Sequence, residues 1–456
     1  MPETHTHPIH NLPPECVAKI FSLVFPKGTE LVRRNPYPWR IALVCRLWRD
    51  IVYSTPKLWS NVTVWLDPLR MSRIDIRGDT LVAAWMLCLS RSGDCSLTVD
   101  IDASTRETMA FVPSLLEPLM EHVGRWEKVK FGFPINLLIP FISDSSIRYP
   151  RLRRFGGRGR DGSILTNERP PQIQLFPNAP LLSTLHLSEF SYAPLGLRFP
   201  WSQITELTMY MSEGNAHDLL DGLRHTPNLS NLSFARYYST SSDAAGTHGN
   251  QSLELPYLQK LSWITYMFNS TLLFDSLVAP RLSEIEFQCD DGSWNPGAVG
   301  NFLRRSKCKV TSLKLNSTSP HIAAAFIRML PDVEVVTLHA VTSDTDLMHA
   351  LTYDEAAPFN CVCLKIREIV LHNISFKEEC REDFVLMVQS RLRIPEDGKL
   401  LRIPPRKLDS LRIMISVYPG TDKSLTESLR AYKLLRERLS PGEMASVMYE
   451  EHVMGE

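Results

Sequence analysis

The chain has 456 residues, enough for about two to four domains, or for one small module followed by a long repeat array. Its 50 Lys and Arg residues balance its 50 Asp and Glu residues, so the overall charge indicates neither a nucleic-acid partner nor an acidic membrane surface. The apolar fraction of 44% is typical of a globular protein, and no apolar run approaches the roughly 20 residues that span a bilayer.

The N-terminal residues and the cysteines indicate an intracellular protein. Residues 1–10 lack the basic-then-apolar order of a signal peptide, and we expect them to form a disordered tail. His5, His7 and His10 fit a polar tail better than a metal site. Nine scattered cysteines are typical of free thiols in a reducing compartment. We therefore expect a cytoplasmic or nuclear location, or both, without a membrane partner.

Residues 11–62 predict a small helical module. Pro13 and Pro14 stand where a first helical turn tolerates proline, because the first amides of a helix have no internal partner. An apolar stripe then follows at helical spacing, and it consists of Val17, Ile20, Phe21 and Val24. The segment 26–28, Pro-Lys-Gly, is a stop signal for this helix.

A second helical run begins near Trp39. It places Leu43, Leu47 and Ile51 on one face, and the three predicted helices make a unit of about fifty residues that needs a partner surface. The stretch from Phe25 to Pro38 interrupts the module, and we expect it to loop out. An ordinary helical hairpin within a larger core is the alternative interpretation.

Several short motifs occur in a fixed order within this module. They are Leu12-Pro13, Glu15, Ile20-Phe21, Val44-Cys45-x-x-Trp48 and Pro56-x-Leu58-Trp59. The series resembles the F-box, a module that links proteins to SCF-type ubiquitin ligases. The resemblance implies that the unit binds the SCF adaptor subunit and, through it, the cullin scaffold. The residues that it assigns to adaptor contact are Leu12, Pro13, Ile20, Leu23, Val44, Cys45 and Trp48.

Residues 63–423 carry an irregular repeat. A phrase of three apolar residues, at positions one, four and six, occurs eleven times at intervals of about 22 to 33 residues, with a last interval of about 42; the first two occurrences fit more loosely, and the second ends in Gly157. The phrases begin at Trp126, Leu152, Leu182, Ile204, Leu229, Leu258, Leu282, Val310, Val333, Ile366 and Leu408.

Each phrase predicts a short strand whose alternate residues point into a shared core. Helices are expected before some strands, as in Thr80–Leu89 and Ser114–Val123. The predicted fold class is α/β, with the helical module followed by a leucine-rich-repeat solenoid shaped as a horseshoe. An ordinary α/β domain with unrelated strands is the alternative. The whole chain resembles fungal-type F-box proteins with irregular leucine-rich repeats.

The C-terminal residues 424–456 predict a cap and a tail. Ser424-x-x-Glu427 is a capping-box pattern that opens a helix through about Arg438. Its polar face suits the end of a solenoid. The acidic stretch around Glu450-Glu451 is expected to fray, and residues 237–253 are rich in small polar residues and predict a flexible loop.

The polar positions within the repeat strands predict a binding face. Those that we assign to substrate binding are Lys128, Lys130, Arg154, Arg158, Glu206, Tyr210, Glu284 and Glu286. Further positions on this face are His186, Lys314, His339, Glu368, His372 and Arg412. The basic start of the face suits an acidic or phosphorylated element of a partner. Simple solvation is the alternative for each residue.

Motifs for catalysis and for cofactors are not found. Cys361-x-Cys363 has the wrong spacing for a zinc knuckle, and the glycine- and arginine-rich segment 156–160 predicts a solvated loop. We therefore expect no enzyme activity, cofactor or resident metal, and no nucleic-acid partner. Two functions remain: a substrate-recognition subunit of an SCF-type E3 ubiquitin ligase with an unknown protein substrate, or an interaction scaffold without a role in ubiquitylation.

Overall fold

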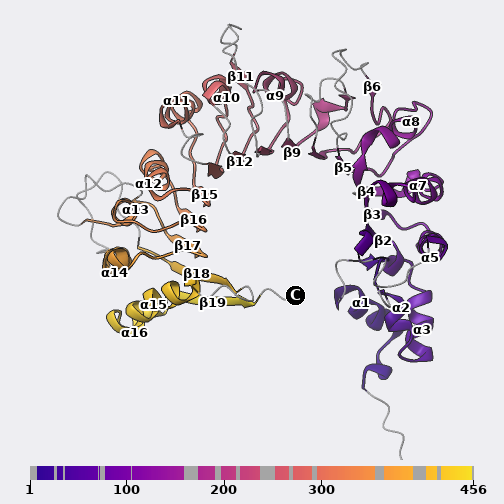
Figure 1. Cartoon of the computed structure of the whole chain (residues 1–456), viewed down its shortest axis with the longest axis horizontal. Helices are drawn as coiled ribbons and strands as arrows, with labels where there is room; N and C mark the ends of the chain where they lie inside the picture. Colours follow the sequence, from indigo (N-terminus) through magenta and orange to yellow (C-terminus); the bar gives the residue numbers. More distant parts are fainter. Residues whose placement is uncertain are drawn as a thin grey trace, which may run out of the picture. The chain divides into compact units, whose positions relative to one another are not determined.

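Parallel strands with helices against one face form most of the molecule (Figure 1). The computed structural model describes residues 8–24, 28–33, 36–69, 71, 78–103, 105–158, 173–189, 197–211, 216–236, 252–265, 271–289, 295–354, 364–393, 407–417 and 423–453. The chain divides into two compact units, Met1–Met209 and Tyr210–Glu456. The predicted α/β class is confirmed, whereas the horseshoe solenoid stays a prediction.

The first unit begins with short helices and continues with a sheet. Its helices are η1 (Pro8–Asn11), α1 (Pro14–Val24), α2 (Trp39–Ala42), α3 (Arg46–Tyr53), η2 (Pro56–Trp59), α5 (Gly78–Arg91), α6 (Arg106–Met109), α7 (Val112–Met120), η3 (Val123–Arg125), η4 (Ile135–Leu137), α8 (Ile139–Ile142) and η6 (Trp201–Gln203). Its strands are β1 (Thr29–Glu30), β2 (Asn61–Leu66), β3 (Leu97–Ala103), β4 (Trp126–Pro134), β5 (Arg154–Arg158), β6 (Ile173–Gln174), β7 (Thr184–Ser188), β8 (Leu197–Arg198) and β9 (Glu206–Met211), within which the two units divide.

The sheet of the first unit is parallel. Its strand order is β1-β2-β3-β4-β5-β7, followed by β9, while β6 and β8 pair separately. Helices α5 and α7, predicted over Thr80–Leu89 and Ser114–Val123, precede β3 and β4. Trp85 of α5 is fully buried, and its indole N–H donates to the Leu115 carbonyl of α7 at 2.9 Å. The helices are therefore joined to each other on one face of the sheet.

The second unit repeats this arrangement of parallel strands and helices. Its helices are α9 (Ala216–Leu223), α10 (Thr271–Ser276), α11 (Pro296–Ser306), α12 (Pro320–Met329), α13 (Thr345–Leu351), η8 (Glu378–Cys380), α14 (Arg381–Leu392), α15 (Lys423–Arg438) and α16 (Pro441–Met444). Its strands are β10 (Asn231–Arg236), β11 (Leu253–Glu254), β12 (Lys260–Thr265), β13 (Leu277–Val278), β14 (Glu284–Cys289), β15 (Ser312–Asn316), β16 (Val335–His339), β17 (Glu368–His372), β18 (Ser410–Val417) and β19 (Val447–Val453).

The strands of the second unit are also parallel. Their order is β10-β12-β14-β15-β16-β17-β18-β19, and β11 pairs with β13 beside them. Figure 1 shows α10 to α14 on the same face of these strands. Among the described residues, the opposite face carries the polar positions of each repeat and no helix (Figure 1).

All eleven apolar phrases lie on strands or directly before them. The three positions of every phrase are buried, as Leu258 before β12 and Leu261 and Trp263 within β12 illustrate. The phrase at Leu152 ends in Gly157 because the Phe155 ring fills the space: a Cβ on Gly157 would lie 2.9 Å from Phe155 Cε1. The predicted strand positions and their inward face are therefore confirmed.

Three predictions about local structure are wrong. The stretch around Glu450-Glu451 is not a frayed tail, because it belongs to β19, which pairs with β18 over Leu411↔Val447 to Val417↔Val453. Gly156 to Arg158 are not a solvated loop, because they form β5 between β4 and β7. The disordered tail was predicted through residue 10, but η1 begins at Pro8.

The predicted C-terminal helix is confirmed as α15, Lys423–Arg438. A capping box lies one helix later, at α16: Ser440 Oγ accepts from the Glu443 amide, and the Glu443 carboxylate accepts from the Ser440 amide at 2.7 Å. The side chains of the predicted box, Ser424 and Glu427, lie outside the described residues. Residues 237–251 of the predicted loop and Cys361-x-Cys363 also lie outside them, whereas Leu253 belongs to β11.

None of the helices that the structure describes combines the length and the apolar character needed to cross a bilayer.

Candidate functional site

Helix α1 divides its apolar residues between a core and an exposed side. The Pro13 carbonyl accepts from the Cys16 and Val17 amides, so the proline stands at the helix start without losing a hydrogen bond. Val17 and Phe21 are buried, but Leu23 and Val24 are 65% and 59% exposed. The predicted apolar stripe is therefore only partly a core stripe.

The second helical run is broken in two. The chain leaves α2 at Leu43 and enters α3 at Arg46, so the expected face of Leu43, Leu47 and Ile51 is not continuous. Ile51 is buried, whereas Leu43 is 66% exposed and Val44 is 60% exposed. The prediction of one helix across this stretch is wrong, because its periodicity passes through a turn.

The Cys45-x-x-Trp48 spacing has a structural cause. Cys45 has an extended backbone and caps α3, because its Sγ accepts from the Trp48 amide at 3.5 Å. The Trp48 ring then packs edge-on against Phe21 of α1, with ring centres 5.0 Å apart. Arg49 Nε donates to the Ala42 carbonyl of α2 at 3.0 Å. These contacts hold the end of α1 beside the start of α3.

The closing Pro-x-Leu-Trp motif is part of the core. Trp59 is fully buried, its indole N–H donates to the Val52 carbonyl at 2.9 Å, and its ring packs against Trp39 and Tyr53. Such a buried aromatic group stabilises the unit through area and ring contacts. This motif therefore stabilises the core of the helical unit, and it does not contribute Trp59 to the surface that a partner could contact.

The insertion between the two halves does not loop out over its described part. Thr29 and Glu30 form β1, which pairs in parallel with β2, and the Leu31 amide donates to the Thr63 carbonyl at 2.9 Å. Leu31 and Val32 are buried. The prediction failed because two apolar residues and a two-residue strand are too short a pattern to identify from sequence.

The helical unit exposes an unusual share of apolar side chains. Of the 13 large apolar residues that are exposed among the described residues, six lie between residues 12 and 47. They are Leu12, Leu23, Val24, Leu43, Val44 and Leu47, which we call the apolar surface of the helical unit. Because Phe21 contacts Trp48, the segments that carry Leu23 and Val44 are neighbours. Several exposed apolar side chains on neighbouring segments are typical of an interaction site.

This surface agrees in part with the residues that the F-box resemblance assigned. Leu12, Leu23 and Val44 are exposed apolar residues and Pro13 is exposed, whereas Ile20, Cys45 and Trp48 are half-buried. Val24, Leu43 and Leu47 were not predicted. Their position at a helix end and at the α2–α3 turn exposes them, and periodicity alone does not show where a helix stops.

The helical unit is joined to the sheet without a linker. The predicted boundary after residue 62 falls inside β2, which pairs with β3 from Asn61↔Thr98 to Leu66↔Ala103. The Ser60 carbonyl accepts from the Thr98 amide at 2.9 Å, and the Arg91 guanidinium lies 4.8 Å from the centre of the Tyr53 ring. Within the first unit, the helices therefore continue directly into the strands.

The helix-free face of the first unit carries paired charges. Lys130 pairs with Asp100 at 3.5 Å, Arg154 lies 3.8 Å from Glu206, and Arg158 pairs with Glu189 at 2.5 Å. Three residues of the basic start that the sequence predicted are thus paired with carboxylates on β3, on β9 and directly after β7. Burial lowers the pKa of His186 on the same face, and Lys130 and Arg154 act in the same direction.

The second unit has similar pairs between adjacent strands. Lys260 pairs with Glu284 at 3.5 Å, Lys314 with Glu286 at 2.6 Å, and Arg412 with Glu368 at 3.3 Å. Burial alone would raise the pKa of Glu286, but hydrogen bonds from Lys314 and Asn316 outweigh this effect and lower the pKa below its usual range. Two residues predicted to bind substrate remain, Lys128 on β4 and Tyr210 on β9. The Lys128 side chain is exposed and the Tyr210 side chain is half-buried. The assignment of these residues to substrate binding stays a prediction.

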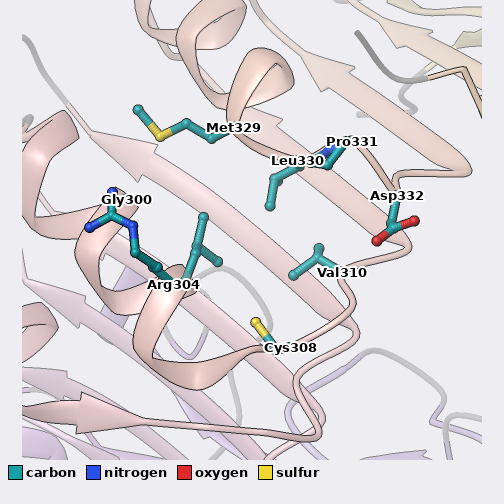
Figure 2. Close-up of a pocket in the computed structure, with 9 residues that line it drawn as sticks. Gly300, Arg304, Cys308, Val310, Met329, Leu330, Pro331 and Asp332 are labelled. Atoms are coloured by element: carbon teal, nitrogen blue, oxygen red, sulfur yellow. The ribbon is translucent and has the colours of Figure 1, made fainter.

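A shallow groove of about 360 Å³ lies between the C-terminal ends of α11 and α12 (Figure 2). Arg304, Cys308, Val310 and Met329 are among its lining residues. Burial raises the pKa of the Cys308 thiol, so this cysteine is protonated at neutral pH and is a poor nucleophile. Asp332 at the groove edge is already paired with Lys365. The groove is therefore a shallow surface depression in which neither Cys308 nor Asp332 is available as a nucleophile or a base.

Clusters of three or more His, Cys, Asp or Glu side chains that suit a metal ion do not occur among the described residues.

Comparison with protein families identifies the helical unit. Residues 9–64 match the family described as F-box-like. A comparison with curated proteins finds no match for the chain. The family match covers α1 to α3, η2 and most of β2, and therefore includes the whole apolar surface of the helical unit.

Proposed function

We propose that the chain is the substrate-recognition subunit of an SCF-type E3 ubiquitin ligase, in which the F-box-like unit binds the adaptor. The observation that carries the proposal is the apolar surface of the helical unit, which lies within the residues that match the F-box-like family. F-box domains typically bind the adaptor of SCF complexes. Cys45, Trp48 and Trp59 fold the unit, so Leu12, Leu23 and Val44 are free to meet the adaptor.

We place the substrate on the helix-free face of the strands. The recurring phrases, the parallel strand order and the helices on one face support an irregular leucine-rich-repeat solenoid. In this respect the chain resembles fungal-type F-box proteins with leucine-rich repeats. The role is recognition without enzyme activity, in the cytoplasm, the nucleus or both.

The paired charges refine which substrate this face suits. Since Lys130, Arg154 and Arg158 each face a carboxylate, the face offers alternating signs and no simple basic patch. A partner with both acidic and basic side chains complements such a surface better than a uniformly acidic one, because like charges opposite each other are unfavourable. The candidates for substrate contact remain Lys128, Lys130, Arg154, Arg158, Glu206, Tyr210, Glu284 and Glu286.

Charge reversal tests the placement of the substrate. Lys128→Glu together with Arg154→Glu should reduce the capture of partner proteins by proximity labelling, while adaptor binding is kept. The loss should shrink in added salt, because the Debye length falls from about 10 Å at 0.1 M to about 3 Å at 1 M. Recovery of the same partners in the same amounts would place the substrate elsewhere.

The second candidate is an interaction scaffold without a ligase role, which the same apolar surface also permits. Co-purification separates the two. A tagged full-length chain should recover both the adaptor and the cullin if it is a ligase subunit. Recovery of neither, from a chain that is folded by circular dichroism, would favour the scaffold.

A further inference from the structure

Two histidines lie side by side on the helix-free face of the second unit. His339 is the last residue of β16 and His372 the last of β17, and they are partners in the parallel register. Their ring centres are 4.4 Å apart with planes inclined by 57°. Register partners on adjacent strands place their side chains on the same face of the sheet, so the two imidazoles are close enough to share a ligand.

The backbone holds both histidines at defined strand ends. Ala340 and Asn373, which follow them, both have a φ of +52°. The Ala340 amide donates to the His372 carbonyl at 2.8 Å, and the Asn373 amide donates to the Met414 carbonyl at 2.9 Å. The same bend recurs one strand earlier, where Ser317 has a φ of +44°. The pair therefore belongs to a repeated structure and not to an irregular loop.

A third donor lies next to the pair. Asn316 of β15 is the register partner of His339 and is only 9% exposed. Its Nδ2 donates to Glu286 Oε1 at 2.7 Å, which leaves its amide oxygen on the side away from Glu286. Within the described residues, this oxygen is buried without a hydrogen-bond donor. A buried acceptor without a donor is costly, and a cation can satisfy it.

We propose that His339 and His372 bind a divalent cation of borderline softness such as Zn²⁺, with the amide oxygen of Asn316 as a third donor. Imidazole nitrogen suits this class of ion, and the remaining position is open to water or to a side chain of a bound partner. The inference does not depend on a ligase role for the chain.

The ring geometry is close to what such a site needs. With a Zn–N distance of about 2.0–2.1 Å, each ring centre lies about 3.2 Å from the metal, so a tetrahedral angle sets the centres about 5.2 Å apart. The observed 4.4 Å requires the rings to separate by less than about 1 Å. Small side-chain rotations achieve this without moving the strands.

The surrounding charges permit a cation at this position. The nearby Lys314 is neutralised by Glu286, which lies 2.6 Å from it. On the other side, Glu368 and Arg412 form a neutral pair.

Calorimetric titration of the full-length chain with Zn²⁺ tests the site. The background should carry His5→Ala, His7→Ala and His10→Ala, so that tail histidines do not bind the metal. We expect one Zn²⁺ per chain, with binding more than about tenfold weaker in His339→Gln and in His372→Gln, since even outer-shell partners of metal ligands contribute about 10–100-fold. His225→Gln, an exposed histidine outside the pair, should bind as the background does.

A second measurement avoids any failure of the variants to fold. Zn²⁺ should protect His339 and His372 of the unmodified chain from acylation by diethyl pyrocarbonate, as read by mass spectrometry, while His225 stays reactive. Zn²⁺ binding that survives both substitutions, or acylation of the pair that Zn²⁺ does not slow, would overturn the proposal.

Discussion

Truncation of the apolar surface of the helical unit should separate adaptor binding from folding. The change is Leu23→Ala together with Val44→Ala, two side chains from neighbouring segments that are 65% and 60% exposed. Burying a whole Leu or Val side chain contributes about 1.5–3 kcal/mol, so the exposed fractions here correspond to about 1–2 kcal/mol each. The pair should weaken adaptor binding by about 2–4 kcal/mol, or roughly 30- to 700-fold.

The same change should leave the fold intact. Exposed side chains contribute little to stability, and we expect a loss below about 0.5 kcal/mol per residue. The matched control is Phe21→Ala, because Phe21 is buried against Trp48 and its truncation should cost about 3–5 kcal/mol of unfolding free energy.

Titration calorimetry with the purified adaptor gives the affinity, and urea unfolding gives the stability of each variant. Unchanged adaptor affinity in a folded Leu23→Ala, Val44→Ala chain would refute the assignment of this surface. A large loss of stability in that variant would instead show that the two side chains belong to the core.

Three further predictions concern the fold and its pH dependence. Leu313→Ala should cost about 2–5 kcal/mol because Leu313 is fully buried, whereas Lys314→Ala, which removes a partly exposed ion pair, should cost under about 1 kcal/mol; equal losses in urea unfolding would refute the strand register. Gly28→Ala should lower the melting temperature, since Gly28 has a φ of +82° and an added Cβ would lie 2.5 Å from the Asn61 carbonyl oxygen; an unchanged melting temperature would show that β1 does not depend on this turn. Arg393 and Ser440 hold the pKa of Glu443 at about 2, below its usual 4.5, so its contribution to stability is present above pH 4.5 and is lost as the pH falls towards 2. Glu443→Gln should remove that part of the pH dependence, and an identical acid-unfolding curve would argue against the pairing.

The sequence predicted the repeat strands well because each phrase carries its own signal. In β14, the buried Ile285 and Phe287 alternate with Glu284, Glu286 and Gln288, and a strand with one buried face requires that pattern. The strand β3 has the same alternation from Leu97 to Ala103 without the repeat phrase, so it was missed by a search for the phrase alone. The short β1 offered no periodicity to detect.

The features that the sequence could not show depend on contacts between distant residues. Arg154 on β5 and Glu206 on β9 pair across β7, and this pairing follows from the strand order, which no local sequence pattern encodes. The turn before α3 depends on Cys45 acting as a cap, although cysteine is not among the usual capping residues. The exposure of Leu43 and Val44 follows from that turn.

Ubiquitylation of captured partners tests the central proposal most directly. Proteins that are proximity-labelled by the full-length chain should be compared with those labelled by the Leu23→Ala, Val44→Ala variant, and their ubiquitin should be measured by mass spectrometry. A substrate-recognition subunit predicts that the same partners are captured by the variant but carry less ubiquitin and accumulate. Equal ubiquitin and equal abundance of those partners with both chains would contradict the proposed role.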